Sequence, residues 1–456
     1  MIARVLRCAG TAVFVAAALV ACAGDDADSQ AVEPFASTYQ PLPADDVLYT
    51  NATLLTGTGE RYDAASILLR DGKIRAIGPS IRPPSGVPTV DVGGRWITPG
   101  IIDVHSHLGV YASPGVHAHS DGNEMTAPVT AEVWAEHSVW PQDPGFSAAL
   151  AGGVTTLQIL PGSANLIGGR TVTVKNVPGS DVQSMKFPGA PHGLKMACGE
   201  NPKRVYGAGR NSAPGTRMGN VAGYRDAWIR AADYRRRRDS DDAPVRDLEL
   251  ETLAGVLDGD ILVHIHCYRA DEMSIMLDVA KEFGYRVTAF HHAVESYKIT
   301  AQLAEHDVCS AMWADWWGFK MEAFDGIREN VAFVDAGGAC AIVHSDSALG
   351  IQRLNQEAAK AMAAGKRAGL ELSEADAIAW ITSNAAKALG ISEQTGALAV
   401  GKDADIVVWS DNPFSVYARA DLVYIDGARV YDRSDPTRQP LTDFSLGTRA
   451  GSGEAP

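Results

Sequence analysis

Histidine and aspartate residues close several apolar segments of this sequence. His105 and His107 end the segment GIIDVHSH, His266 ends DILVHIH, His292 ends YRVTAFHH, and Asp346 ends GACAIVHSD. Side chains two residues apart on a strand point to the same side, so the imidazoles of His105 and His107 can both reach one cation. The recurrence of imidazole and carboxylate groups at later segment ends predicts a metal site with these residues as ligands.

Further polar residues lie two positions before three of these ligands. Asp103, His264 and His344 share the strand parity of the ligands and should form an inner layer beneath them. Two interpretations stay open for this layer: hydrogen-bond partners that orient the ligands, or ordinary polar residues of the core. Adjacent residues on a strand face opposite ways, so we expect only one of His291 and His292 to reach the site.

The segments that carry these residues alternate with stretches of helix length. This alternation predicts βαβ units and a parallel sheet. Eight candidate strands at residues 98–390 predict an α/β fold with a (β/α)₈ TIM barrel, in which the C-terminal ends of the strands meet at one mouth. An open doubly wound sheet is the alternative, but no glycine-rich phosphate loop follows the first strand. The eight segments are GIIDVHSH, GVTTLQIL, TVTVK, HGLKMAC, DILVHIH, YRVTAFHH, HDVCSAM and GACAIVHSD.

Two shorter segments, at residues 47–97 and 391–435, alternate apolar and polar residues. Each contains a hairpin signal, Asp71-Gly72 in the first and Asp426-Gly427 in the second. Neither segment is long enough to bury a sheet face alone. We therefore expect one small β-sandwich domain built from both ends of the chain.

The first 46 residues have the composition of a targeting segment and a tether. Arg4 and Arg7 precede an apolar stretch that is too short to span a bilayer, and it ends in Leu-Val-Ala-Cys. This pattern predicts a lipoprotein signal peptide at residues 1–22 with lipidation at Cys22; an ordinary signal peptide is the alternative. Residues 23–46 are predicted to be a flexible tether, and residues 436–456 a C-terminal tail. The protein should therefore be periplasmic in the cell envelope, anchored by lipid to the outer membrane.

Charge and cysteine content restrict the partners. The 456-residue chain carries a net charge of −15, which argues against nucleic acid because phosphates require Lys and Arg for neutralisation. Contact with a membrane is expected only through the lipid at Cys22, and a homo-oligomer stays open. Four further cysteines lie near the ends of predicted strands, and their disulfide status also stays open: Cys198, Cys267, Cys309 and Cys340.

A series of motifs in fixed order resembles the amidohydrolase superfamily, in its imidazolonepropionase-like and prolidase-like branch. The resemblance covers nearly the whole chain after the tether, and it is specific for the superfamily but weakly specific for a substrate. The motifs are ITPGIIDVHSHLG, AGGVTTLQILPGSANLIGG, GLKMACGENPKR, VHIHCYRADE, AFHHAVE, VHSDSA, TSNAAKALGI and GALAVGKDADIVVW.

The resemblance implies roles for individual residues. His105, His107, His266 and His292 would bind metal, and Asp346 would be both a ligand and the catalytic proton shuttle. Members of the superfamily with two metals bridge them by a carboxylated lysine or a glutamate on the fourth strand. Lys195 and Glu200 are the two candidates here. We expect a divalent metal, zinc, with two ions per chain; a single ion is the alternative.

These roles imply hydrolysis of a small molecule. A metal-activated hydroxide would attack, and Asp346 would pass its proton to the leaving amine. An amide or other C–N bond, in a dipeptide, an N-acyl amino acid or a cyclic amide, suits such a site. A metal-dependent esterase or lactonase of the same fold is the alternative, and a non-catalytic envelope metal-binding protein is a third interpretation.

Residues in the loops after the strands are candidates for substrate binding. An arginine can hold a substrate carboxylate as a bidentate fork. Trp313, Trp316 and Trp317 are candidates for an apolar wall. The predicted substrate-binding residues are Arg204, Tyr206, Arg217 and Arg269.

Overall fold

The computed structural model describes residues 34–439. The chain divides into a unit at residues 1–36 and a unit at residues 37–456, and the second unit carries the helices and strands of the described range. The predicted signal peptide, its lipidation site Cys22 and most of the predicted C-terminal tail lie outside the described residues. Within residues 34–439, no helix has the length and apolar character that a membrane span requires.

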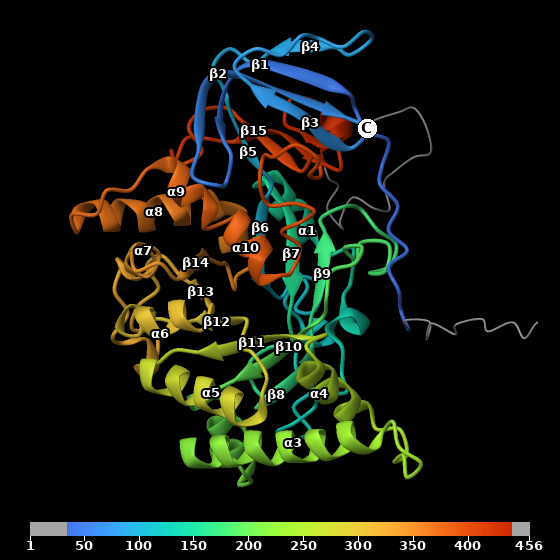
Figure 1. Cartoon of the computed structure of the whole chain (residues 1–456), viewed down its shortest axis with the longest axis vertical. Coiled ribbons are helices and arrows are strands. Elements are labelled where there is room, and N and C mark those ends of the chain that lie inside the picture. The colour runs from blue at the N-terminus through green and yellow to red at the C-terminus, as the bar shows by residue number, and fades with distance from the viewer. Residues whose placement is uncertain (1–33, 440–456) are drawn as a thin grey trace, which may run out of the picture. The chain divides into compact units, whose positions relative to one another are not determined.

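One eight-stranded sheet contains strands from both ends of the described chain, which Figure 1 shows in blue and red. Its order is β17-β16-β15-β5-β1-β2-β3, with β4 paired to β1. Strand β5 runs parallel to β1 and antiparallel to β15, so the two ends of the chain join at β5. The strands are β1 (Val47–Leu55), β2 (Arg61–Arg70), β3 (Lys73–Gly78), β4 (Thr89–Asp91), β5 (Trp96–Pro99), β15 (Ile406–Trp409), β16 (Ala420–Ile425) and β17 (Ala428–Asp432).

Both predicted hairpins are present in this sheet. Strands β2 and β3 pair across Asp71-Gly72, and β16 and β17 pair across Asp426-Gly427. All four turn residues have φ between 49° and 74°. A two-residue turn of this kind matches the twist of the flanking strands, and glycine adopts its positive φ without a steric penalty.

The middle of the chain forms an α/β arrangement with two further sheets. The first has the order β14-β13-β12-β11-β10-β8, and β10 to β14 run parallel to one another. The second has the order β6-β7-β9, in which β6 and β7 are parallel. The strands are β6 (Ile101–Ser106), β7 (Val154–Ile159), β8 (Ile167–Arg170), β9 (Val172–Lys175), β10 (Gly193–Ala197), β11 (Leu262–Cys267), β12 (Ala289–His292), β13 (Cys309–Met312) and β14 (Cys340–Val343).

The predicted third parallel strand, TVTVK, is wrong in direction. This segment is β9, which pairs antiparallel with β7, and its neighbour β8 pairs antiparallel with β10. A parallel connection needs a crossover of a dozen or more residues, usually a helix. The twelve residues between β7 and β9 contain strand β8 and no helix, so no crossover helix is present to bring TVTVK back parallel to β7.

Helices follow most of the parallel strands. The segment at residues 200–258 holds the two predicted helices, α3 and α4, after a π-helical turn at Lys203–Ala208. Thr216 and Asp247 cap their N-termini by accepting from backbone N–H groups three residues on. The helices are α1 (Pro144–Ala151), α2 (Glu200–Pro202), α3 (Arg217–Arg237), α4 (Leu248–Asp258), α5 (Ala270–Phe283), α6 (Thr300–Glu305), α7 (Asn330–Ala336), α8 (Leu354–Arg367), α9 (Glu374–Ala379) and α10 (Ser383–Ala388).

Residues 37–46, predicted as part of the flexible tether, belong to the compact unit. The Thr38 N–H donates to Gln183 O at 3.0 Å, and the Asp45 N–H donates to Gly427 O at 2.8 Å. The buried Tyr39 hydroxyl donates to Asp426 Oδ2 at 2.5 Å. Composition favoured a tether here, but a buried tyrosine and backbone hydrogen bonds hold this stretch against the sheet.

Two disulfides link neighbouring parallel strands. Cys198, just after β10, pairs with Cys267 on β11, and Cys309 on β13 pairs with Cys340 on β14. The Cα–Cα distances are 5.1 Å and 4.4 Å, within the range that a disulfide can span. The pairing follows from the strand order, which places each cysteine beside its partner.

Candidate metal centre

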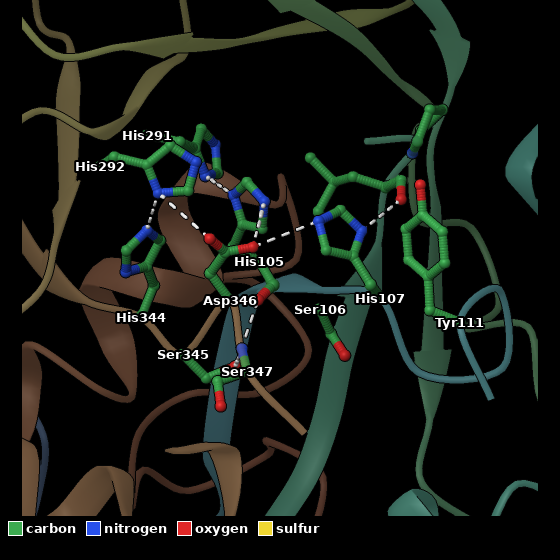
Figure 2. Close-up of polar contacts among 12 residues, drawn as sticks. His105, Ser106, His107, Tyr111, His291, His292, His344, Ser345, Asp346 and Ser347 are labelled. Atoms are coloured by element: carbon green, nitrogen blue, oxygen red, sulfur yellow. Dashed lines mark hydrogen bonds and ion pairs between the residues drawn. The ribbon is translucent and has the colours of Figure 1, made fainter. Parts of the chain in front are cut away.

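The two histidines of the HSH motif and Asp346 lie together at the ends of β6 and β14. His107 Nε2 lies 3.2 Å and His105 Nε2 3.4 Å from the same atom, Asp346 Oδ1. The two imidazole centroids are 5.1 Å apart, as expected for side chains on one side of a strand. Figure 2 shows both rings directed at the Asp346 carboxylate. The three ligand atoms lie within 4.8 Å of one another, which is compatible with a shared cation.

The buried Asp103 holds the backbone beneath this group. Its Oδ1 accepts the N–H groups of His105 and Ser345, each at 3.2 Å, and its Oδ2 accepts the Ser345 hydroxyl. Burial raises the pKa of Asp103 to about 7. Asp103 therefore ties the end of β6 to the residue before Asp346, and it orients the backbone of the ligands rather than their rings.

A second group joins the first through His105. Atoms of His105, His292 and His344 also lie within 4.8 Å of one another. His344 Nε2 is 3.0 Å from His292 Nδ1, and His292 Nδ1 is 3.8 Å from Asp346 Oδ2. The His266 ring lies 4.6 Å from the His292 ring, centroid to centroid, but His266 falls outside both groups.

Several buried ring nitrogens in this cluster have no hydrogen-bond partner among the described residues. They are His105 Nε2, both nitrogens of His266, and His344 Nδ1. Burial, the largest cause, holds the pKa of His105 and His266 well below the usual value and lowers that of His344 to about 4. Neutral imidazoles with free lone pairs are the form that binds metal, so these residues fit a divalent cation.

Lys195, on β10, is the fourth-strand candidate that lies within the cluster. It is fully buried, and its Nζ donates to Pro161 O at 2.9 Å. Burial lowers its pKa to about 7. Burial also lowers the pKa of His105, His264 and His292, and the charge of Lys195 lowers these pKa values further. The charge of Glu200 acts instead on Tyr268 and Lys320.

Both members of the adjacent pair His291-His292 contact His105, but only His292 belongs to a group of possible metal ligands among the described residues. The His105 ring centroid lies 4.8 Å from that of His291 and 4.6 Å from that of His292. The regular alternation of a strand ends here, because His292 has φ +69° and Ala293 has φ +33°. This local break allows neighbouring side chains to turn to the same side.

Aromatic residues that the ligand motifs did not include pack against the cluster. Trp313 stacks on His292 with a centroid distance of 4.4 Å, and Trp316 stacks on Trp313 at 4.8 Å. Tyr268 stacks on His292 at 5.4 Å, and the Lys320 ammonium lies 3.8 Å from the Tyr268 ring centroid. His264, His266 and Tyr268 are spaced two residues apart, so the alternation of a strand could have identified Tyr268 as a residue of the site.

Three of the four predicted substrate-binding residues already have partners in the protein. Arg217 forms ion pairs with Glu272, at 2.9 Å, and with Glu322. Arg269 makes two hydrogen bonds of 2.9 Å to Asp271. Tyr206 is 1% exposed, and its hydroxyl donates to Ala127 O at 2.6 Å.

Arg204 is the remaining member of that set. It is exposed, and its side chain makes no hydrogen bond or ion pair within residues 34–439, so its guanidinium is the one best able to take up a ligand. Its charge lowers the pKa of Lys320, although burial is the larger cause of that shift.

Comparison with known proteins supports the same family. A model described as the amidohydrolase family matches residues 324–433. The amidohydrolase tasK of Hapsidospora irregularis is 33% identical over 82% of this chain, which spans 41% of the length of that protein. The imidazolonepropionase of Brucella anthropi is 24% identical over 83% of this chain and 94% of its own. The crystal structure of an amidohydrolase from Thermotoga maritima MSB8 aligns with a TM-score of 0.78 and 35% identity, covering 85% of this chain and 100% of that one.

The likeness to the Thermotoga maritima protein implies a TIM-barrel-like α/β domain. The match extends over the whole of that protein, at an identity that reflects family membership as well as fold. The predicted enzyme class, a hydrolase of carbon–nitrogen bonds, is confirmed. The chain belongs to the amidohydrolase family.

Proposed function

We propose that the protein hydrolyses an amide or other C–N bond of a small molecule, in a dipeptide, an N-acyl amino acid or a cyclic amide, with divalent metal bound at the candidate centre. The observation that carries this proposal is the convergence of His105 and His107 on Asp346, with His105 Nε2 buried and free of hydrogen bonds within the described range. A buried imidazole nitrogen without a partner is costly unless a cation occupies the space in front of it.

The metal ligands in this proposal are His105, His107, His266, His292 and Asp346. A bound divalent cation would lower the pKa of a water molecule and polarise the substrate carbonyl. Asp346 has the geometry of a proton carrier, because one carboxylate oxygen faces both HSH imidazoles while the carboxylate remains 23% exposed. The carboxylate can take a proton from water on that side and release it to a leaving nitrogen.

We further propose two zinc ions, bridged through Lys195 as a carbamate. The location of Lys195 among the imidazoles supports this choice over Glu200. The backbone N–H of Glu200 donates to Glu322 Oε1 at 2.8 Å. Full burial favours the neutral amine, which is the form that combines with carbon dioxide.

The finer features of the fold belong to the same proposal. We propose a closed (β/α)₈ barrel and a β-sandwich built from the two chain ends, supported by the parallel run β10–β14 and by the shared eight-stranded sheet. Export as a lipoprotein, anchored to the outer membrane through Cys22, is proposed from the N-terminal pattern. The two disulfides are consistent with an oxidising compartment such as the periplasm.

An aromatic wall supports binding of substrates with a large apolar group. Trp313 and Trp316, with Trp317, line a hollow of about 270 Å³ at the ends of β12 and β13. Trp313 also forms one side of the metal centre through its stack on His292. A substrate held at the centre would therefore have an indole surface beside it.

Metal quantification of the purified protein, with and without bicarbonate, tests this proposal. We expect about two equivalents of zinc in wild type, dependence on bicarbonate, loss in Lys195→Ala and no change in Glu200→Ala. Asp346→Asn should retain metal while kcat on the best substrate of a matched amide and ester panel falls about 10²- to 10⁴-fold. Metal-loaded wild-type protein that cleaves no amide in the panel would contradict the proposal.

A further inference from the structure

Three buried imidazoles form a continuous chain that leads away from the metal centre. His105 Nδ1 lies 2.8 Å from His291 Nδ1, and His291 Nε2 lies 2.9 Å from His264 Nδ1. The chain ends at Gln158, whose amide nitrogen lies 3.4 Å from His264 Nε2. All four side chains are at most 1% exposed. His105 joins this series through Nδ1, the nitrogen away from Asp346, whereas His291 and His264 each use both ring nitrogens.

The number of hydrogens in such a chain restricts its arrangement. A neutral imidazole carries one N–H and one lone pair, and each contact between two rings needs one of each. Only two arrangements satisfy both ring–ring contacts. In the first, His105 Nδ1 donates to His291 and His291 Nε2 donates to His264, which leaves a lone pair on His105 Nε2. In the second, the hydrogens run the other way and His105 Nε2 carries the hydrogen.

Only the first arrangement allows His105 to bind metal. His105 Nε2 is the nitrogen that faces Asp346, at 3.4 Å, and a protonated Nε2 cannot be a ligand. The non-ligating nitrogen of a metal-binding histidine normally donates to a fixed acceptor, which sets the tautomer and the ring orientation. Here that acceptor is another histidine, whose own tautomer is set in turn by His264.

Gln158, next to His264, can accept a hydrogen bond in the arrangement in which His105 donates to His291 and His291 donates to His264. With His264 Nε2 as a donor, the Gln158 amide must present its oxygen, and that oxygen can also accept the Thr171 hydroxyl, which lies 2.9 Å from the present amide nitrogen. The two orientations of an amide differ only by rotation of its terminal torsion. In the orientation that the structure has, Gln158 Oε1 has no hydrogen-bond partner among the described residues.

Gly193 leaves the space that His264 and Gln158 occupy. A Cβ at this position would lie 2.8 Å from His264 Cδ2, 3.1 Å from Gln158 Nε2 and 2.7 Å from Thr171 Oγ1. Its φ is not in the left-handed region, so the need for glycine here is one of space. His264, Gln158 and Thr171 therefore pack directly against Gly193, where a larger residue would have no room for its side chain.

We propose that His291 and His264 are positioning residues that, together with Gln158, hold His105 in the Nδ1–H tautomer and so keep its Nε2 available for metal. This inference rests on the metal site proposed above. It gives the two histidines of the adjacent pair separate roles, with His292 as a ligand and His291 as the acceptor behind His105.

We call the series His105, His291, His264 and Gln158 the histidine relay. The zinc affinity of the full-length protein, measured by competition with a chromogenic chelator, tests its role. We expect His291→Phe and His264→Phe to weaken zinc binding about 10- to 100-fold. His291→Gln, whose amide oxygen can accept from His105 Nδ1–H, should recover part of that loss. Thermal unfolding of each metal-free variant controls for packing, because a merely structural role would lower stability equally in His291→Gln and His291→Phe.

A spectroscopic measurement adds a direct readout of the tautomer. In metal-free protein labelled with ¹⁵N-histidine, His105 should show a protonated Nδ1 in the wild type, and this signature should be lost in His264→Phe. Zinc binding by His291→Phe as tight as in wild type, or equal losses in His291→Gln and His291→Phe, would overturn the relay while leaving the metal site intact. Wild-type protein that binds no zinc would instead refute the proposed metal site, and the relay with it.

Discussion

Lys175 is the buried cation of a charge network that joins β9 to the eight-stranded sheet. Its ammonium lies 2.6 Å from Asp426 Oδ1, 3.0 Å from Asp403 Oδ2 and 3.6 Å from Asp405 Oδ2. Lys175 is 2% exposed, and the three aspartates are at most 8% exposed. Replacing Lys175 with Met therefore leaves three buried carboxylates without the cation that they share.

The size of the effect follows from the burial. Removing one partner of a buried ion pair costs about 3–5 kcal/mol, because the remaining charge keeps its desolvation penalty and loses its compensation. For a unit of about 400 residues, the unfolding entropy converts a loss of about 4 kcal/mol into a fall in Tm of about 5 °C. We expect this fall in Lys175→Met by calorimetry or circular dichroism.

Lys73→Met provides the matched control. Lys73 forms its ion pair with Asp403 at 2.5 Å, but 41% of its side chain is exposed. Exposed ion pairs contribute about 0–1 kcal/mol, so Tm should fall by about 1 °C or less. A loss in Lys175→Met no larger than that in Lys73→Met would refute the reasoning.

The pH dependence of the difference in stability between wild type and Lys175→Met gives a second check. Burial, only partly offset by Lys175, already raises the pKa of Asp405 to about 6, so the folded state binds a proton there that the unfolded state does not. Stability through this group is thus gained as pH falls through about 6 towards 4. Without Lys175 the carboxylate pKa values rise further, and the variant takes up more protons than wild type. The stability deficit of Lys175→Met should narrow between pH 7 and 5, by about 1.4 kcal/mol per pH unit for each additional proton bound.

Further predictions concern the site and its supports. Arg217→Met should destabilise the protein by about 3–5 kcal/mol in urea unfolding, because two buried glutamates lose their shared cation, whereas Arg269→Met should cost about 1 kcal/mol or less. A rise in KM without destabilisation in Arg217→Met would instead favour substrate binding. Trp316→Ala should lower kcat/KM about 10-fold for amides with an aromatic side chain and leave alanine analogues unchanged; equal effects on both would contradict the aromatic wall. Loss of the disulfide in Cys309→Ser/Cys340→Ser should lower the free energy of unfolding by about 4 kcal/mol, and unchanged unfolding would refute this.

Local patterns in the sequence were sufficient for several features. The turn pairs Asp71-Gly72 and Asp426-Gly427 favour positive φ, and the structure has a hairpin at each. The strand period of two places His105 and His107 on one side, where both contact Asp346. Each of these inferences depends on residues that are neighbours along the chain, so a short stretch of sequence contains all the information that it needs.

One prediction failed because the connection between the strands overrode the local pattern, and two others need the tertiary contacts to be interpreted. TVTVK has the composition of a parallel barrel strand, but no crossover helix separates it from β7, and the two strands pair antiparallel. The alternation rule predicted that only one of His291 and His292 reaches the site; both rings contact His105, and His292 is the one that belongs to a group of possible metal ligands. The substrate-binding role of Arg217 stays a prediction, and two buried glutamates form ion pairs with its guanidinium.

The sequence by itself determined the family, the alternation of strands and helices, and the histidine and aspartate residues predicted to bind metal, because these depend on residue types and short spacings. Only the tertiary structure decided which partners those residues have. Lys195 rather than Glu200 lies among the imidazoles, each cysteine pairs with the one on the adjacent strand, and Lys175 meets Asp426 across 251 positions of sequence. Such contacts depend on strand order and on burial, which are properties of the assembled fold and have no local signal in the chain.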